Sequence, residues 1–205
     1  GNSQAAQLVA LGLHALQHRG QDSTGVVTTD NINFFAHRGM GQVSEVFSNK
    51  KVFSHLKGGL SIGHNRYGTT GESALKNVQP LFSELNFGGV SLAHNGNLTN
   101  AQKLKKKLIE SGAIFQSTSD TEVILHLLST TKGNIVDRII YSLKSISGAY
   151  ALLLMTEDTL IGIRDPYGIR PLVIGKLGES YVFSSESCGL DIIGAELIRD
   201  VEPGE

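Results

Sequence analysis

Two arginines stand where the chain could bind a small anion. Residues 63–70 read G-H-N-R-Y-G-T-T after an apolar run, and alternation places Ile62, His64 and Arg66 on one face of a strand. Arg66 would then lie at a sheet edge, where its planar fork of donors could bind a carboxylate, although a lone surface arginine is the alternative. Arg19, in L-Q-H-R-G, could hold a loop, contact an anion or face the helix dipole.

A second set of residues could handle a carbonyl and an amine. Residues 94–97 read H-N-G-N, and the pattern predicts a tight turn at the end of a strand. The Asn95 amide beside the Gly96 N–H would supply the two donors of an oxyanion hole, although Asn-Gly is also a common hairpin turn. Asp120, at the start of an expected helix, could accept an ammonium group or serve helix stability alone. Together these groups match the needs of a site that hydrolyses the side-chain amide of glutamine.

The elements that position these residues follow from hydrophobic periodicity. Helical patterns cover residues 4–17, 99–110 and 135–145, and a capping-box motif at residues 119–122 predicts another helix that starts near Asp120. The predicted strands are residues 25–28, 34–36, 60–64, 90–94, 149–155, 160–163, 172–174 and 181–184. Strands, then helices, then strands with hairpin-length links indicate an α+β fold with antiparallel sheets covered by helices.

Composition indicates one globular domain, covering residues 1–205. Hydrophobic residues make up 40% and charged residues 18%, and the formal net charge is -1, so no broad positive field exists to attract nucleic acid. No segment is apolar enough to suggest a membrane span. The single cysteine, Cys188, cannot form an internal disulfide and fits a reducing cytoplasm. A chain that opens at Gly1 is expected to be incomplete or processed.

Several segments carry a resemblance over essentially the whole chain. They read A-L-Q-H-R-G-Q-D-S-T-G, G-H-N-R-Y-G-T-T, N-V-Q-P-L, H-N-G-N-L-T-N, S-T-S-D-T-E-V, G-A-Y-A-L-L-L-M-T, R-D-P-Y-G-I-R-P-L and S-S-E-S-C-G-L-D-I-I-G-A. They resemble the glutaminase domain of the glutamine phosphoribosylpyrophosphate amidotransferases. Glucosamine 6-phosphate synthase and other sister amidotransferases share some of these themes, but N-V-Q-P-L and R-D-P-Y-G-I-R-P-L favour the purine enzyme.

The resemblance implies a fold and a site. The fold would be a four-layer α-β-β-α sandwich of two antiparallel sheets, of the N-terminal-nucleophile hydrolase type. Arg66 would bind the glutamine α-carboxylate and Asp120 its α-amino group, while Asn95 and Gly96 would form the oxyanion hole. The other substrate-binding residues would be Tyr67, Thr69 and Arg19.

Two parts of the family's enzyme are missing from this sequence. The nucleophile is an N-terminal cysteine whose own amine acts as base, and a strand of about 5 to 8 residues carrying it would precede Gly1. The C-terminal phosphoribosyltransferase domain, where Mg²⁺ is expected, would follow Glu205. There ammonia would convert phosphoribosylpyrophosphate to 5-phosphoribosylamine, the first step of purine synthesis, in a homo-oligomer. The alternatives are an inactive glutamine-binding module and a sister amidotransferase.

Cys188 has two interpretations. In S-E-S-C-G-L-D it matches the position where the resemblance places one ligand of a [4Fe-4S] cluster. A lone free cysteine is also commonly a small buried hydrophobe. It is not expected to be the nucleophile, because it lacks the free amine that activates the family's cysteine.

Overall fold

The computed structural model describes residues 1–67 and 74–205. Its α-helices are α1 (Ala5–Ala15), α2 (Val43–Val46), α3 (Val52–His55), α4 (Ala101–Glu110), α5 (Thr121–Thr130), α6 (Ile135–Ser145) and α7 (Cys188–Asp191), with 3₁₀ turns η1 (Gln17–Arg19) and η2 (Leu75–Asn77). The predicted bounds of α6 are confirmed, and the Asn134 side chain caps the helix by accepting the Asp137 N–H. None of these helices, within the described residues, is long and apolar enough to cross a membrane.

The strands of the described residues form three antiparallel sheets. They are β1 (Ser23–Thr29), β2 (Phe34–Met40), β3 (Leu60–Arg66), β4 (Leu81–Leu85), β5 (Gly88–Leu98), β6 (Gly148–Met155), β7 (Leu160–Arg164), β8 (Val173–Leu177), β9 (Ser180–Ser184) and β10 (Glu196–Asp200). The strand orders are β2-β1-β3 (sheet A), β4-β5-β6-β7 (sheet B) and β10-β8-β9 (sheet C). β4, β10 and the short helices were not predicted.

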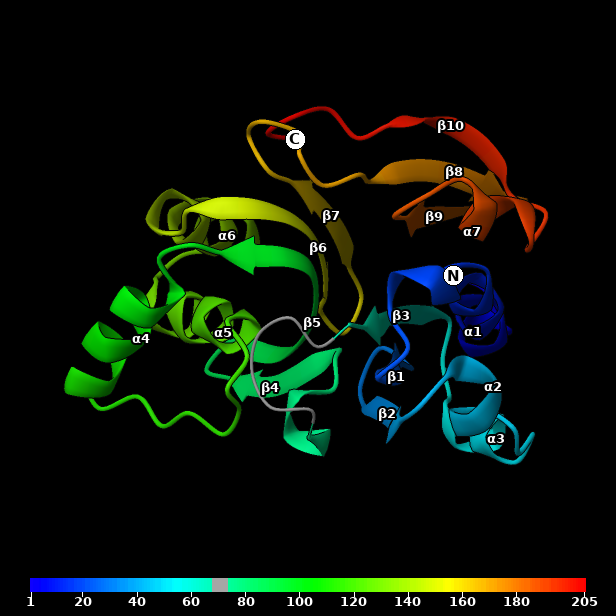
Figure 1. The fold of residues 1–205 in the computed structure, drawn as a ribbon, viewed down its shortest axis with the longest axis horizontal. Coiled ribbons are helices and arrows are strands. Elements are labelled where there is room, and N and C mark those ends of the chain that lie inside the picture. Colours follow the sequence, from blue (N-terminus) through cyan, green and yellow to red (C-terminus); the bar gives the residue numbers. More distant parts are fainter. Residues whose placement is uncertain (68–73) are drawn as a thin grey trace.

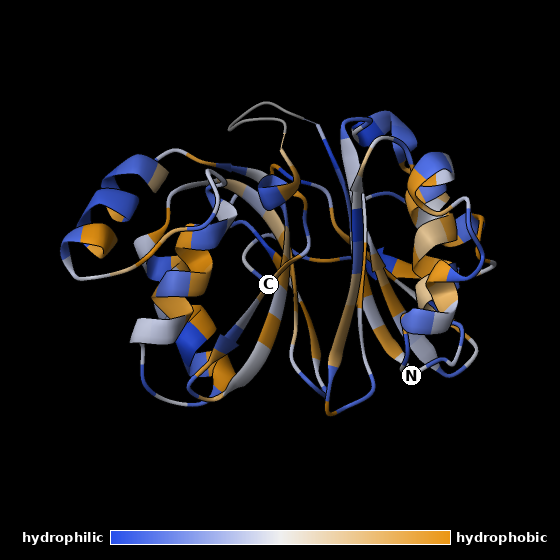
Figure 2. Ribbon diagram, turned by 90° about the horizontal axis from the view of Figure 1, so that it is seen from below, coloured by the Kyte–Doolittle hydropathy of each residue, from blue (hydrophilic) through white to orange (hydrophobic). Residues whose placement is uncertain are grey.

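The layers follow from three apolar cores. Val27 and Ile62 of sheet A pack against Ala93 and Met155 of sheet B. The outer face of sheet A is covered by α1, α2 and α3, and that of sheet B by α4, α5 and α6. Figure 2 shows the strands standing between the two groups of helices. The predicted four-layer α+β sandwich is confirmed.

Sheet C modifies the prediction of two sheets. Ile174 and Phe183 of sheet C pack with Ala151 of β6, while Leu190 of α7 covers the other side. Leu153 of β6 contacts both the core under sheet A and the core under sheet C. Sheets A and C therefore lie side by side over one face of sheet B, so one strand layer is divided in two (Figure 1).

The start of α5 was predicted correctly, but the capping box is not formed. The Ser119 hydroxyl accepts the N–H of Thr121 at 3.3 Å, which begins the helix. The Glu122 carboxylate instead accepts the N–H groups of Gln116 and Ser117 at 2.8 and 2.7 Å. Glu122 thus organises the preceding loop, because two unpaired backbone donors there need an acceptor.

Candidate active site

Residues 93–98 of β5 have one open edge. β5 pairs with β4 as far as Leu92, whereas its pairing with β6 continues to Leu98. Asn95 and Gly96 therefore lie inside a strand, opposite Ala151 and Tyr150, and the predicted tight turn is wrong. Pairing with β6 keeps this dipeptide extended, although its local preference is for a turn.

The open edge presents a row of backbone donors. The N–H of His94 donates to Gln79 Oε1 at 2.7 Å, and the N–H of Leu98 donates to Asp120 Oδ2 at 2.8 Å. Alternate residues of a strand direct their N–H groups to the same edge, so the Gly96 N–H points there too, between these two contacts. This placement suits a backbone donor of an oxyanion hole.

Position 96 requires a glycine. A Cβ there would collide with the carbonyl oxygen of Ala149 and would stand 2.7 Å from His94 Nε2. The imidazole of His94 therefore occupies the space beneath Gly96 that a side chain would need. This packing fixes the backbone of β5 at the donor row.

Asp120 is held beside the same edge. Its Oδ1 lies 3.6 Å from Nδ1 of the buried His94, while its Oδ2 accepts the Leu98 N–H. Burial alone would raise the pKa of Asp120, but the interaction with His94 and the hydrogen bond from Leu98 outweigh burial and hold the pKa below its ordinary value. The carboxylate is therefore charged at neutral pH and can pair with an ammonium group.

β3 brings Arg66 to this place. His64 Nε2 lies 3.0 Å from the carbonyl oxygen of His94, which joins the end of β3 to the open edge of β5. Burial lowers the pKa of His64 to about 4, with the neighbouring His94 adding to the effect, so the imidazole is neutral at pH 7. Arg66, two residues further on, is the last residue of β3 and only 6% exposed. Its predicted place at the end of an edge strand is confirmed.

A groove of about 420 Å³ separates the facing edges of β3 and β9. In the sheets of the described residues, each of these strands has a partner on one side only. Gly1 and Asn2 lie at one end of the groove, where the Asn2 N–H donates to the carbonyl oxygen of Gly59 just before β3. The other end is lined by His64, Asn65, Asn95, Ser184 and Ser185. The groove thus leads from the first residues to the open edge of β5.

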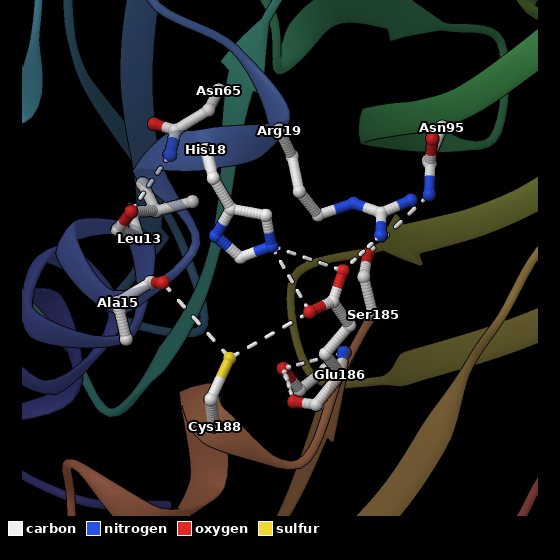
Figure 3. A network of polar contacts seen from close by, with 10 residues as sticks. Leu13, Ala15, His18, Arg19, Asn65, Asn95, Ser185, Glu186 and Cys188 are labelled. Atoms are coloured by element: carbon white, nitrogen blue, oxygen red, sulfur yellow. Dashed lines mark hydrogen bonds and ion pairs between the residues drawn. The ribbon is translucent and has the colours of Figure 1, made fainter.

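Figure 3 shows a polar network at the β5 end of the groove. The Glu186 carboxylate forms a close ion pair with Arg19 and lies 3.0 Å from His18 Nε2. The neighbouring Ser185 hydroxyl is 3.5 Å from Asn95 Nδ2. Arg19 is therefore fixed beside the site by a loop that follows β9. Sequence reasoning missed Ser185 and Glu186, whose signal was the S-S-E-S motif before Cys188.

Cys188 is partly buried at the start of α7, beside Glu186. Its Sγ lies 3.8 Å from Glu186 Oε2 and 3.9 Å from the carbonyl oxygen of Ala15. Burial raises the pKa of the Cys188 thiol, and the neighbouring Glu186 carboxylate raises it further. No group of three or more His, Cys, Asp or Glu among the described residues could hold a metal ion. The [4Fe-4S] cluster stays a prediction, because the resemblance places its other ligands outside this chain.

The two remaining predicted substrate-binding residues are Tyr67 and Thr69. Tyr67 is 66% exposed, immediately after β3. Thr69 falls within residues 68–73 and lies outside the described residues. The structure thus gathers Arg66, Asn95, Gly96 and Asp120 around the ends of β3 and β5, with Arg19 at the groove.

Comparison with known proteins agrees with this geometry. Residues 64–191 match the glutamine amidotransferase domain family. The amidophosphoribosyltransferases of Rhizobium etli and Bacillus subtilis are 53% and 49% identical to this chain over its full length. The chain covers 42% and 43% of those proteins, and other relatives are named chloroplastic, from Arabidopsis thaliana.

Solved structures show the same fold. Glutamine phosphoribosylpyrophosphate amidotransferase from B. subtilis, complexed with ADP and GMP, matches with a TM-score of 0.93 and 47% identity, over 99% of this chain and 44% of that one. A structure described as the allosteric regulatory enzyme of purine biosynthesis matches with a TM-score of 0.95 and 48% identity, over 99% and 44%. The family match covers more than half of the chain, and it includes β5, Asp120 and Cys188. The chain belongs to the glutamine amidotransferase domain family.

Proposed function

We propose that this chain is the glutamine-hydrolysing part of an amidophosphoribosyltransferase. It would release ammonia from glutamine, and the rest of the enzyme would use that ammonia to convert phosphoribosylpyrophosphate to 5-phosphoribosylamine in purine synthesis. The names of the full-length relatives support this assignment. The observation that carries it is the groove between β3 and β9, which ends beside the donor row of β5.

The groove suits an extended segment that carries the nucleophile. A strand placed there could pair with β3 on one side and β9 on the other, joining sheets A and C into one layer. If its last residue meets Gly1, a segment of about six residues reaches roughly 20 Å toward His64 and Ser185. Its first residue, a cysteine with a free amine, would then lie beside Asn95 and Gly96.

The arrangement supports a defined pose of glutamine. The guanidinium of Arg66 would bind the α-carboxylate, and the Asp120 carboxylate the α-ammonium group. The amine of the cysteine would accept the proton of its own thiol, and the sulfur would form a bond to the side-chain carbonyl carbon. The carbonyl oxygen would then accept hydrogen bonds from the Asn95 amide and the Gly96 N–H. The C–N bond then breaks, and the leaving nitrogen takes a proton from the amine of the cysteine. Water hydrolyses the resulting thioester to glutamate.

The remaining partners belong to the same proposal. Ammonia would pass to a phosphoribosyltransferase domain that uses Mg²⁺ and follows Glu205, which fits relatives more than twice as long as this chain. We also infer a homo-oligomer in a cytoplasmic, reducing compartment; the free thiol of Cys188 is consistent with the compartment. Cell fractionation and size-exclusion chromatography of the full-length protein test these two points.

The Arg66→Ala variant of the full-length protein tests the proposed function. We expect glutamine-dependent synthesis of phosphoribosylamine to fall about a hundredfold or more, because the α-carboxylate loses its charged partner. Ammonia-dependent synthesis should stay within about twofold, since it bypasses the glutamine site. Arg199→Ala, on an exposed strand, is the matched control. Equal loss of both activities would refute the role of Arg66 in glutamine binding.

A further inference from the structure

Gln79 bridges two elements of the candidate site. It belongs to the N-V-Q-P-L segment, which the proposed reaction does not use, and its side chain is buried, with 6% exposed. Its Oε1 accepts the His94 N–H at 2.7 Å, and its Nε2 donates to Thr121 Oγ1 at 3.1 Å. One amide therefore connects the open edge of β5 with the first residue of α5.

Thr121 lies at the α5 end of this bridge. The residue is fully buried, and its hydroxyl also accepts a hydrogen bond from Ser119 Oγ at 3.0 Å and lies 3.3 Å from His94 Nδ1. Thr121 directly follows Asp120, so a shift of Thr121 moves the carboxylate with it. Buried hydrogen bonds of this kind hold one arrangement, because breaking one leaves a donor or acceptor unpaired.

Glutamine needs a fixed distance between the groups that bind it. Its α-ammonium group and its amide oxygen are separated by a short carbon chain, so Asp120 and the Gly96 N–H must stand at a matching separation. Gln79 spans the two elements that carry them, because it replaces β4 as the partner of β5 at His94.

We propose that Gln79 is a positioning residue that sets Asp120 against the donor row of β5 and thereby supports recognition of the α-ammonium group of glutamine. The inference rests on the proposed function, which assigns that role to Asp120. Gln79 itself touches neither the substrate nor the reacting atoms. Its effect should therefore appear as lost discrimination between substrates with and without the α-amino group.

The test compares hydrolysis of glutamine and of glutaramate, which lacks the α-amino group, by the full-length enzyme. In Gln79→Met, which keeps the volume of the side chain and removes its hydrogen bonds, kcat/KM for glutamine should fall about tenfold or more. For glutaramate it should change less than about twofold. Thr121→Val removes the other end of the bridge and should act in the same direction. Gln102→Met, on the exposed side of α4, is the matched control.

The outcomes separate this inference from the proposed function. Asp120→Asn should abolish the preference for glutamine over glutaramate. If it does so while Gln79→Met and Thr121→Val both keep that preference, or lower both substrates alike, the positioning role is overturned and the role of Asp120 stands. If Asp120→Asn leaves the preference unchanged, the role of Asp120 and the inference fall together. If Gln79→Met shows no cooperative unfolding transition, this variant does not fold. The substrate preference of Thr121→Val then tests the positioning role.

Discussion

Asp120 and Asp165 both accept backbone N–H groups at the end of an element. They differ in how many of their acceptor sites are used by donors of the protein itself. Asp165 is 0% exposed and accepts the N–H groups of Tyr150, Tyr167, Ile169 and Arg170. Asp120 accepts one N–H group, from Leu98, and lies near His94. In both residues burial would raise the pKa of the carboxyl group, and hydrogen bonds lower it below the ordinary value.

The contrast shows how to separate a structural carboxylate from a binding one. The four donors around Asp165 use its acceptor sites and shape the loop from β7 to β8, so nothing remains for a ligand. Asp120 keeps acceptor capacity at the open edge of β5. A lowered pKa alone does not distinguish the two residues, whereas occupancy by internal donors does.

The largest expected effect is on stability, when Asp165 is replaced. Asp165→Asn should lower the free energy of unfolding by about 4 kcal/mol, because the single oxygen of an amide can keep at most two of the four N–H donors. Asp120→Asn should lower it by less than about 1 kcal/mol, since the amide oxygen still accepts the Leu98 N–H. Urea unfolding of the two variants measures both values. A similar cost for both would mean that Asp120 is as structural as Asp165.

A smaller effect on stability is expected from His64, whose neutral imidazole lies between β3 and β5. Its pKa of about 4 lies below the ordinary 6.5, so the unfolded chain binds one proton more between these pH values. The corresponding stability, about 3 kcal/mol, is present above about pH 6.5 and is lost as pH falls toward about 4. Urea unfolding at pH 7 and pH 4.5 should show a smaller pH difference for His64→Asn than for the natural sequence.

The matched control for that measurement is His14→Asn, because His14 is exposed on α1. It should leave the pH difference as it is in the natural sequence. An unchanged difference in His64→Asn would show that His64 titrates normally. The open edge of β5 would then carry a positive charge in mildly acidic solution, which opposes binding of an ammonium group.

Local patterns predicted much of the fold. The apolar period of α6 and its Asn134 cap are contained within a dozen residues, and its bounds were predicted correctly. The Asn95–Gly96 turn failed because β6, more than fifty residues away, pairs with that dipeptide and holds it extended. β10 was missed because its five residues are all exposed and lack the alternating pattern of a half-buried strand.

The site was predicted only in part, because some of its residues have a local signal in the sequence and others do not. Arg66 and Asp120 stood out because charged residues at strand and helix ends have a recognisable chemistry. Gln79, His64 and Glu186 gain their importance only from partners distant in sequence, such as His94 and Arg19. No local pattern reports those contacts.

The most direct test of the proposed function labels the nucleophile of the natural full-length protein. A diazoketone analogue of glutamine alkylates a nucleophile held at the position of the amide carbon, and peptide mapping with N-terminal sequencing locates the adduct. We predict an adduct on an N-terminal cysteine of a short segment that precedes Gly1, blocked by excess glutamine, with Cys188 unmodified. A mature protein that starts at Gly1, or an adduct on Cys188 alone, would contradict the account.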